Sequence, residues 1–205
     1  DFQDEVARYS QLLGGLLRQQ GQFARAAALD GDAVSVLTAL LAKDPNNTNT
    51  QHDLTESHLE SSRQQLAVGD VDAAGRSAQS ALTMIQAALA KQSGDRAWTL
   101  LAAQTHTALG QIAAKRNDIG TAHRHWAQAR DTIAPAAHSG EDPNFLAAWA
   151  GTLLLLDDLD AARPLVAKLA AMGYRTADFV ALATGKKLPY PQDAELTRRI
   201  AESTN

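Results

Sequence analysis

The stretch that decides the fold of this chain is residues 111–129, which read QIAAKRNDIGTAHRHWAQA. Its landmarks are a turn residue, Asn117, a small residue seven positions earlier and an alanine five positions later. The same landmarks recur around Gly69 and Gly21, at equal intervals toward the N-terminus, and a diverged copy follows around Asp157 at a shorter interval. Such a period, roughly 40–48 residues, predicts stacked helical hairpins, because each hairpin can bury its apolar face only against its neighbours.

The landmarks occupy equivalent positions in four units. The turn residues are Gly21, Gly69, Asn117 and Asp157. The small residues seven positions before them are Gly14, Ser62, Gly110 and Ala150. The alanines five positions after them are Ala26, Ala74, Ala122 and Ala162.

Apolar spacing and turn residues predict helices along the whole chain and no strand. The predicted helices cover about residues 3–20, 23–43, 50–68, 71–91, 96–116, 119–133, 143–156, 159–172 and 176–184. Residues 135–140 are predicted to form a loop, and residues 193–202 a last short helix. The helices pair into hairpins at about 3–45, 48–93, 95–135 and 143–173 within one domain over residues 1–175, and residues 176–205 form a capping helix and tail.

The third unit carries the residues of a known repeat most fully: Leu109-Gly110, Asn117, Ala122, Trp126 and Ala129. It resembles a tetratricopeptide repeat (TPR). The resemblance implies an all-α, right-handed superhelical solenoid of about four hairpins with a short C-terminal capping helix. Gly21 and Pro45 are 24 residues apart, against about 17 in the family. The excess of seven is close to two helical turns, so the second helix is longer without its apolar face turning away from the core.

The resemblance further implies that the first helix of each hairpin lines a concave peptide-binding surface. The family's groove positions correspond to Arg8, Gln11, Arg18 and Gln19 in the first unit, Glu56, Leu59 and Arg63 in the second, Gln104, Thr107, Gln111 and Lys115 in the third, and Asn144, Ala147 and Gly151 in the fourth. Four cations against one carboxylate predict a positive surface for an acidic or polar peptide. The alternative is that these cations only keep the helices soluble. The family's carboxylate clamp uses a Lys and an Asn where this chain has Gln11 and Gly15, which disfavours that ligand class.

Composition and spacing exclude several other functions. The absence of Cys removes disulfides, thiol catalysis and cysteine metal sites, and a net charge of -4 argues against nucleic-acid binding. The apolar run at 145–156 is too short to span a membrane. The histidines do not place three or four convergent ligands on one helix face, and Ser61-Ser62 has no adjacent base. We therefore expect no metal, no cofactor and no catalytic residue, and interpret the chain as a non-enzymatic module.

A second resemblance concerns context. The segments at 43–46, 172–175 and 178–179 are similar to C-terminal parts of some bacterial serine/threonine kinases and transmembrane regulators. That resemblance implies a sensor or docking domain in the periplasm, with the cytoplasm as the alternative. The chain opens without Met and shows no signal peptide, so we expect it to be a fragment of a longer protein. The competing interpretation of its function is a structural module for self-association. The pattern leaves the ligand and the oligomeric state open.

Overall fold

The structure, a computed structural model, describes residues 6, 9, 10, 12–14, 16, 17 and 22–190. This part of the chain is helical and contains no strand, as predicted. The chain forms two compact units, residues 1–129 and 130–205, and the division falls within one helix. The repeat pattern does not predict that division.

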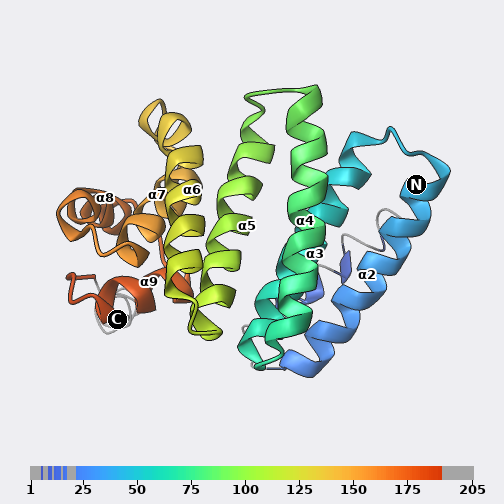
Figure 1. Cartoon of the computed structure of the whole chain (residues 1–205), viewed down its shortest axis with the longest axis horizontal. Coiled ribbons are helices and arrows are strands. Elements are labelled where there is room, and N and C mark those ends of the chain that lie inside the picture. The colour runs from blue at the N-terminus through green and yellow to red at the C-terminus, as the bar shows by residue number, and fades with distance from the viewer. Residues whose placement is uncertain (1–5, 7–8, 11, 15, 18–21, 191–205) are drawn as a thin grey trace, which may run out of the picture. The chain divides into compact units, whose positions relative to one another are not determined.

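The first unit is a series of helices packed in chain order. It contains α2 (Phe23–Lys43), α3 (Thr48–Ala67), α4 (Val71–Lys91), α5 (Arg96–Lys115) and the first part of α6 (Ile119–His138). From α2 to α5, each helix contacts the next one, and α3 also contacts α5 (Figure 1). The core between them contains Leu37, Leu59, Ala81, Ile85 and Leu101, all buried. Before α2, the described residues between 6 and 17 are helical, in agreement with the predicted first helix.

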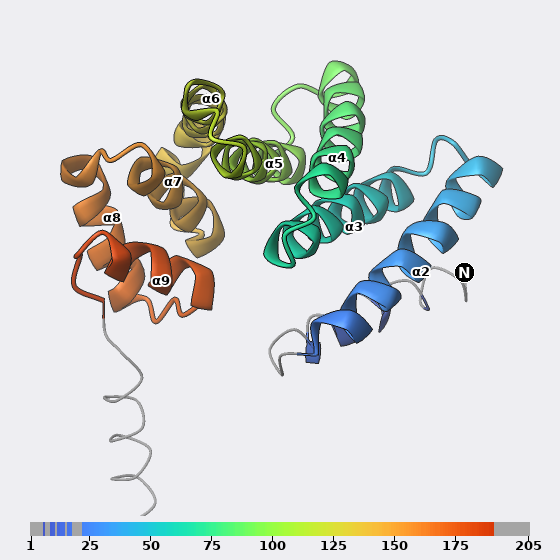
Figure 2. The same cartoon turned by 60° about the horizontal axis from the view of Figure 1, so that its bottom comes forward.

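The second unit contains the end of α6 together with α7 (Pro143–Leu155), α8 (Leu159–Ala171) and α9 (Ala177–Gly185). Its helices α7, α8 and α9 lie together in Figure 2 and share one core of buried side chains. Leu154, Val166, Leu169 and Ala183 lie at its centre. Tyr190 is also buried there, and its hydroxyl donates a hydrogen bond to the carbonyl of Tyr174.

The turn inside each described hairpin uses the same two-residue device. Gly69, Asn117 and Asp157 have positive φ angles of 88°, 60° and 60°. The N–H of the next residue then donates to a carbonyl five residues back, for example from Asp118 to Ala113 at 2.9 Å, which closes the preceding helix as a Schellman motif. The following Asp then caps the next helix, since the Asp118 side chain accepts from the N–H of Thr121 at 3.0 Å.

The small residues of the repeat lie where paired helices cross. Gly14, Ser62, Gly110 and Ala150 are buried, as are Ala74, Ala122 and Ala162. At the second crossing the Ser62 hydroxyl donates to the carbonyl of Ala74 at 2.8 Å. That bond explains why a serine can occupy this buried position. The predicted packing role is confirmed at two crossings, by the contact of Ser62 with Ala74 and by that of Gly110 with Trp126.

The prediction of a loop at residues 135–140 is wrong, because α6 continues to His138 with Pro135 inside it. Proline cannot donate the helical hydrogen bond, but Pro135 is exposed, so water can reach the carbonyl left without a partner. The extended turn carries the His138 ring to Trp149, with ring centroids 4.1 Å apart. His138, the last residue of the extra turn, makes this ring contact. The last helix, predicted at 193–202, lies outside the described residues.

Candidate functional site

The outward side of α3 is a polar stripe. Asp53, Glu56, Glu60 and Arg63 recur at three- and four-residue spacing, and Glu56 is exposed while the others are partly exposed. The Arg63 guanidinium forms an ion pair with Glu60. Leu59 points the other way and is 0% exposed in the core, so its predicted place in the groove is wrong. A leucine in this helix contributes more free energy by burial against α4 and α5 than by facing solvent.

The outward side of α5 is a second stripe made of residues that the sequence assigns to the groove. Gln111 and Lys115 are exposed, and Gln104 and Thr107 are partly exposed. The Thr107 hydroxyl donates to the carbonyl of Ala103 at 2.9 Å, so it is already engaged within its own helix. The step of seven from Gln104 to Gln111 is close to two helical turns, which keeps both amides on one side of the helix.

The two stripes belong to helices that contact each other, α3 and α5. We define the first-helix face as Glu56, Glu60, Arg63, Gln104, Thr107, Gln111 and Lys115. Arg8, Gln11, Arg18 and Gln19, predicted for the same surface, lie outside the described residues. In the second unit Asn144 is exposed and Gly151 partly exposed, whereas Ala147 is buried in the core and the prediction for it is wrong.

The surroundings of two residues in the first half of α3, Glu56 and His52, shift their pKa values. Glu56 is exposed, yet desolvation by the surrounding protein raises the pKa of its carboxyl. Nearby protein weakens hydration of the charged form, which favours the protonated carboxyl. One turn earlier, a hydrogen bond with Asp53 raises the pKa of His52, and the His52 ring meets Trp98 edge-on at 5.3 Å.

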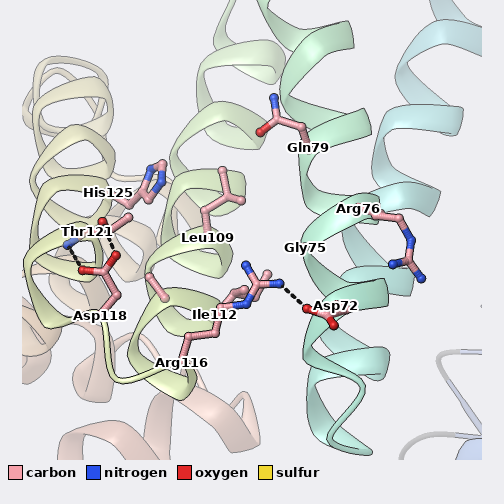
Figure 3. Close-up of a pocket in the computed structure, with 11 residues that line it drawn as sticks. Asp72, Gly75, Arg76, Gln79, Leu109, Ile112, Arg116, Asp118, Thr121 and His125 are labelled. Carbon is pink, nitrogen blue, oxygen red and sulfur yellow. Dashed lines mark hydrogen bonds and ion pairs between the residues drawn. The ribbon is translucent and has the colours of Figure 1, made fainter.

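A hollow of about 480 Å³ opens on α4, α5 and α6, shown in Figure 3. Leu109, Ile112 and Ala113 of α5 give it an apolar floor. Its polar lining consists of Asp72, Arg76 and Gln79 from α4, Arg116 after α5, and Asp118, Thr121 and His125 around the start of α6. Gly75 completes the α4 wall.

At one end of the hollow, Arg116, Asp72 and Asp118 form ion pairs or hydrogen bonds within the protein. Arg116 reaches α4, where it forms an ion pair with Asp72 at 2.7 Å and donates to the carbonyl of Val71 at 3.3 Å (Figure 3). Gly75 leaves room for it, since a Cβ there would lie 3.3 Å from the guanidinium. Hydrogen bonds from Thr121 lower the pKa of Asp118. Arg76 points away from α5 in Figure 3. The contacts of Arg116 at this end therefore join the end of α5 to α4.

Sequence reasoning missed the hollow and a contact at its other end. The Nδ1 atoms of His106 and His125 lie 3.2 Å apart, although the residues are far apart in the chain. Their helical positions could have suggested the meeting, because α5 and α6 form one predicted hairpin. Spacing along the sequence relates His125 to His123 and not to His106. Within the part of the chain that the structure describes, no three His, Cys, Asp or Glu side chains converge as a metal site.

The hairpins combine a positive-φ turn residue, a capping Asp and buried small residues at the helix crossings. These hairpins are TPR-like. No protein-family model matches the chain, and no curated protein matches its sequence. Among solved structures it is similar to a thermophilic TPR protein from Thermus thermophilus, with 17% identity, a TM-score of 0.48, and coverage of 97% of this chain and 98% of that chain. The hairpins are called TPR-like because of the spacing of their turn, capping and small residues, and not because of this structural similarity.

Among the described helices, none combines the length and the apolar character that crossing a membrane requires.

Proposed function

We propose that the chain is a non-catalytic module that binds a polypeptide segment of a partner protein on the first-helix face. The observation that carries this proposal is that α3 and α5, which are in direct contact, each carry a stripe of polar side chains that are at least partly exposed. Equivalent positions then recur at the interval of the repeat, Glu56 with Gln104 and Arg63 with Gln111. Such a surface offers one set of polar groups per repeat, which suits a ligand that is itself a repeating chain.

The charges along α3 and α5 favour one orientation of the bound segment. Glu56 and Asp53 mark the beginning of α3, whereas Arg63 and Lys115 stand in the C-terminal halves of α3 and α5. A partner segment would place carboxylates near Arg63 and Lys115, as the acidic-peptide prediction requires. Glu60 already pairs with Arg63, so the cationic strip on the described helices is weaker than the four predicted cations suggest. The gain from each exposed ion pair is only about 0.2–1 kcal/mol, and binding would need several contacts together.

The amide side chains between the charged ends support the same proposal. Gln104 and Gln111 can each donate and accept hydrogen bonds, so they can pair with the backbone of an extended segment whatever its sequence. We propose that the amides bind the backbone and that Lys115 and Arg63 select carboxylates. As a sensor or docking part of a bacterial serine/threonine kinase or transmembrane regulator, in the periplasm, the module would present this face to the partner. That context rests on the segment resemblance alone.

The test is a peptide selection followed by charge reversal. Peptides are selected from a random display library on the chain, and their affinity is measured by fluorescence anisotropy for the wild type and for Arg63→Glu with Lys115→Glu. We expect affinity for acidic peptides to fall at least tenfold, with unchanged helical content. The matched control, Arg76→Glu with Lys91→Glu on α4, makes the same charge change and should leave affinity unaltered. Equal losses in both variants would contradict the proposal.

Self-association is a second candidate, and one observation favours it. Before α2, the described residues Tyr9, Leu12, Leu13 and Leu16 are exposed and spaced three and four apart, with Tyr9 69% exposed. That spacing places them on one side of a helix, and contiguous exposed apolar patches often mark interfaces. Light scattering across a concentration series tests this candidate. Leu12→Glu with Leu16→Glu should give monomers, whereas Val68→Glu, an isolated exposed position, should not change the mass. A wild type that is monomeric at every concentration contradicts self-association.

A further inference from the structure

His106 of α5 and His125 of α6 form a close pair inside the third hairpin. Their Nδ1 atoms are 3.2 Å apart, and their rings lie nearly parallel, 27° apart with centroids 5.4 Å apart. Both side chains are partly exposed, and His125 lines the hollow. Two imidazole nitrogens thus approach each other from different helices beside a space that water can enter.

The separation of the two nitrogens matches that of neighbouring ligands on one metal ion. Imidazole nitrogens bind zinc at about 2.0–2.1 Å, so two of them at a tetrahedral angle lie about 3.3 Å apart. We propose that His106 and His125 form a binding site for a borderline divalent transition-metal ion, the class that imidazole ligands favour. The ion would take the place of the proton that the two Nδ1 atoms now share.

The surroundings define the kind of site. In the part of the chain that the structure covers, no third His, Cys, Asp or Glu joins the pair. The remaining coordination positions would therefore hold water, which reaches His125 through the hollow. A site with two protein ligands and open positions binds more weakly than a closed structural zinc site. The ion should exchange freely, and chelators should remove it without unfolding the chain.

Protonation and orientation of the rings favour metal binding near neutral pH. Burial lowers the pKa of His106, and burial also lowers that of His125, so both rings are neutral where a histidine in water would begin to protonate. The Gln128 side chain, one turn further along α6, acts on the His125 ring and partly offsets the lowering of its pKa. Such an outer contact fixes the orientation of a ligating ring. The site is independent of the first-helix face, so failure of peptide binding would not affect it.

Isothermal titration with ZnCl₂ on the full chain, first stripped with a chelator, tests the proposal. We expect one zinc site in the wild type that is retained in His123→Ala and absent in His106→Ala and in His125→Ala. His123 is the matched control, because it lies on α6 two positions from His125 and its ring lies near Trp126 instead of His106. Absence of heat in the wild type, or heat that survives in His125→Ala, would overturn the proposal.

A second measurement needs no variant and therefore does not depend on folding of the alanine chains. In ¹⁵N-histidine spectra of the wild type, zinc should shift the Nδ1 signals of two histidines and leave the other four unchanged, since the chain has six. A shift of Nε2 signals, or equal shifts spread over all histidines, would show only adventitious binding and would overturn the proposal.

Discussion

At Gly110 the backbone of α5 lies directly against the Trp126 ring of α6. A Cβ built there would lie 2.2 Å from the Trp126 Nε1 and 2.4 Å from its Cδ1, closer than atoms of packed side chains come. The contact explains why the small residue of this repeat is a glycine and not an alanine. It also shows which side chain fills the space, something the repeat pattern alone does not reveal.

We expect Gly110→Ala to destabilise the chain by about 1–3 kcal/mol, because either Trp126 or the helix pair must move to admit the methyl group. Gly120→Ala, in the first turn of α6, is the matched control: its Cβ would meet only the Asp118 carboxylate at 3.8 Å. That control should be neutral or slightly stabilising, since alanine favours helix over glycine. Urea denaturation measures both, and equal midpoints for the two variants would mean that the crossing is not tight.

The histidine pair predicts how stability responds to pH in chelated protein. Burial gives His106 and His125 pKa values below the ordinary 6.5, so the unfolded chain binds more protons than the folded chain as pH falls. Their contribution to stability is complete above about pH 6.5 and is lost as pH falls from there through the lowered folded pKa values. His52 acts in the opposite direction, because its pKa is raised.

Comparison with the variant His106→Gln with His125→Gln isolates the pair from the other histidines. Between about pH 8 and 5, the wild type should lose more free energy of unfolding than the variant does. Denaturant titrations at several pH values give that difference directly. Parallel curves for the two proteins would show that the pair titrates alike in the folded and unfolded chains.

At the scale of elements, the hairpin turns depend on two adjacent residues with different tasks. The first adopts a positive φ and closes one helix, and the second caps the next helix. At the α3–α4 turn these residues are Gly69 and Asp70, and the Asp70 side chain accepts from the N–H of Ala73 at 3.0 Å. Because the two tasks are local, the sequence predicts them well, and the predicted start of α4 matches the structure.

Asp70→Ala should cost about 0.5–2 kcal/mol, the usual range for loss of a capping side chain. Asp70→Asn keeps an accepting oxygen and should retain most of the stability, which separates capping from a general effect of charge. Thermal unfolding followed by circular dichroism compares the two. If Asn is as damaging as Ala, the side chain at this position does not act as a cap.

Elements whose packing depends on distant partners are harder to predict. Thr55, Ser57 and Gln64 are buried in α3. A prediction from apolar spacing expects leucines or similar residues at such positions. The Gln64 Nε2 donates a hydrogen bond to Asp30 of α2, while its buried Oε1 has no partner among the described residues, and no local rule in either helix predicts that bond. Pro135 shows the opposite error. The local rule that proline ends a helix predicted a loop there, but the residue is exposed and the lost hydrogen bond costs little, so the helix continues.

At the scale of the whole molecule, the register of the repeat carries both the fold and the candidate site. The register places Glu56 with Gln104 and Arg63 with Gln111, and these side chains are at least partly exposed on two contacting helices, while their role in binding stays a prediction. The hollow could not be predicted in the same way, because it depends on how α4 and α6 flank α5, whereas the places of His106 and His125 in one hairpin could have suggested their contact. The handedness of the solenoid stays a prediction, as does the binding role of Arg8, Gln11, Arg18 and Gln19.

The central claim is that the first-helix face binds a polypeptide. Hydrogen exchange measured by mass spectrometry, with and without a saturating peptide selected from a random library, tests it most directly. We expect slower exchange in peptic fragments that cover residues 56–63 and 104–115, with fragments from α4 unchanged. Protection confined to α4 and the start of α6, where the hollow lies, would contradict it.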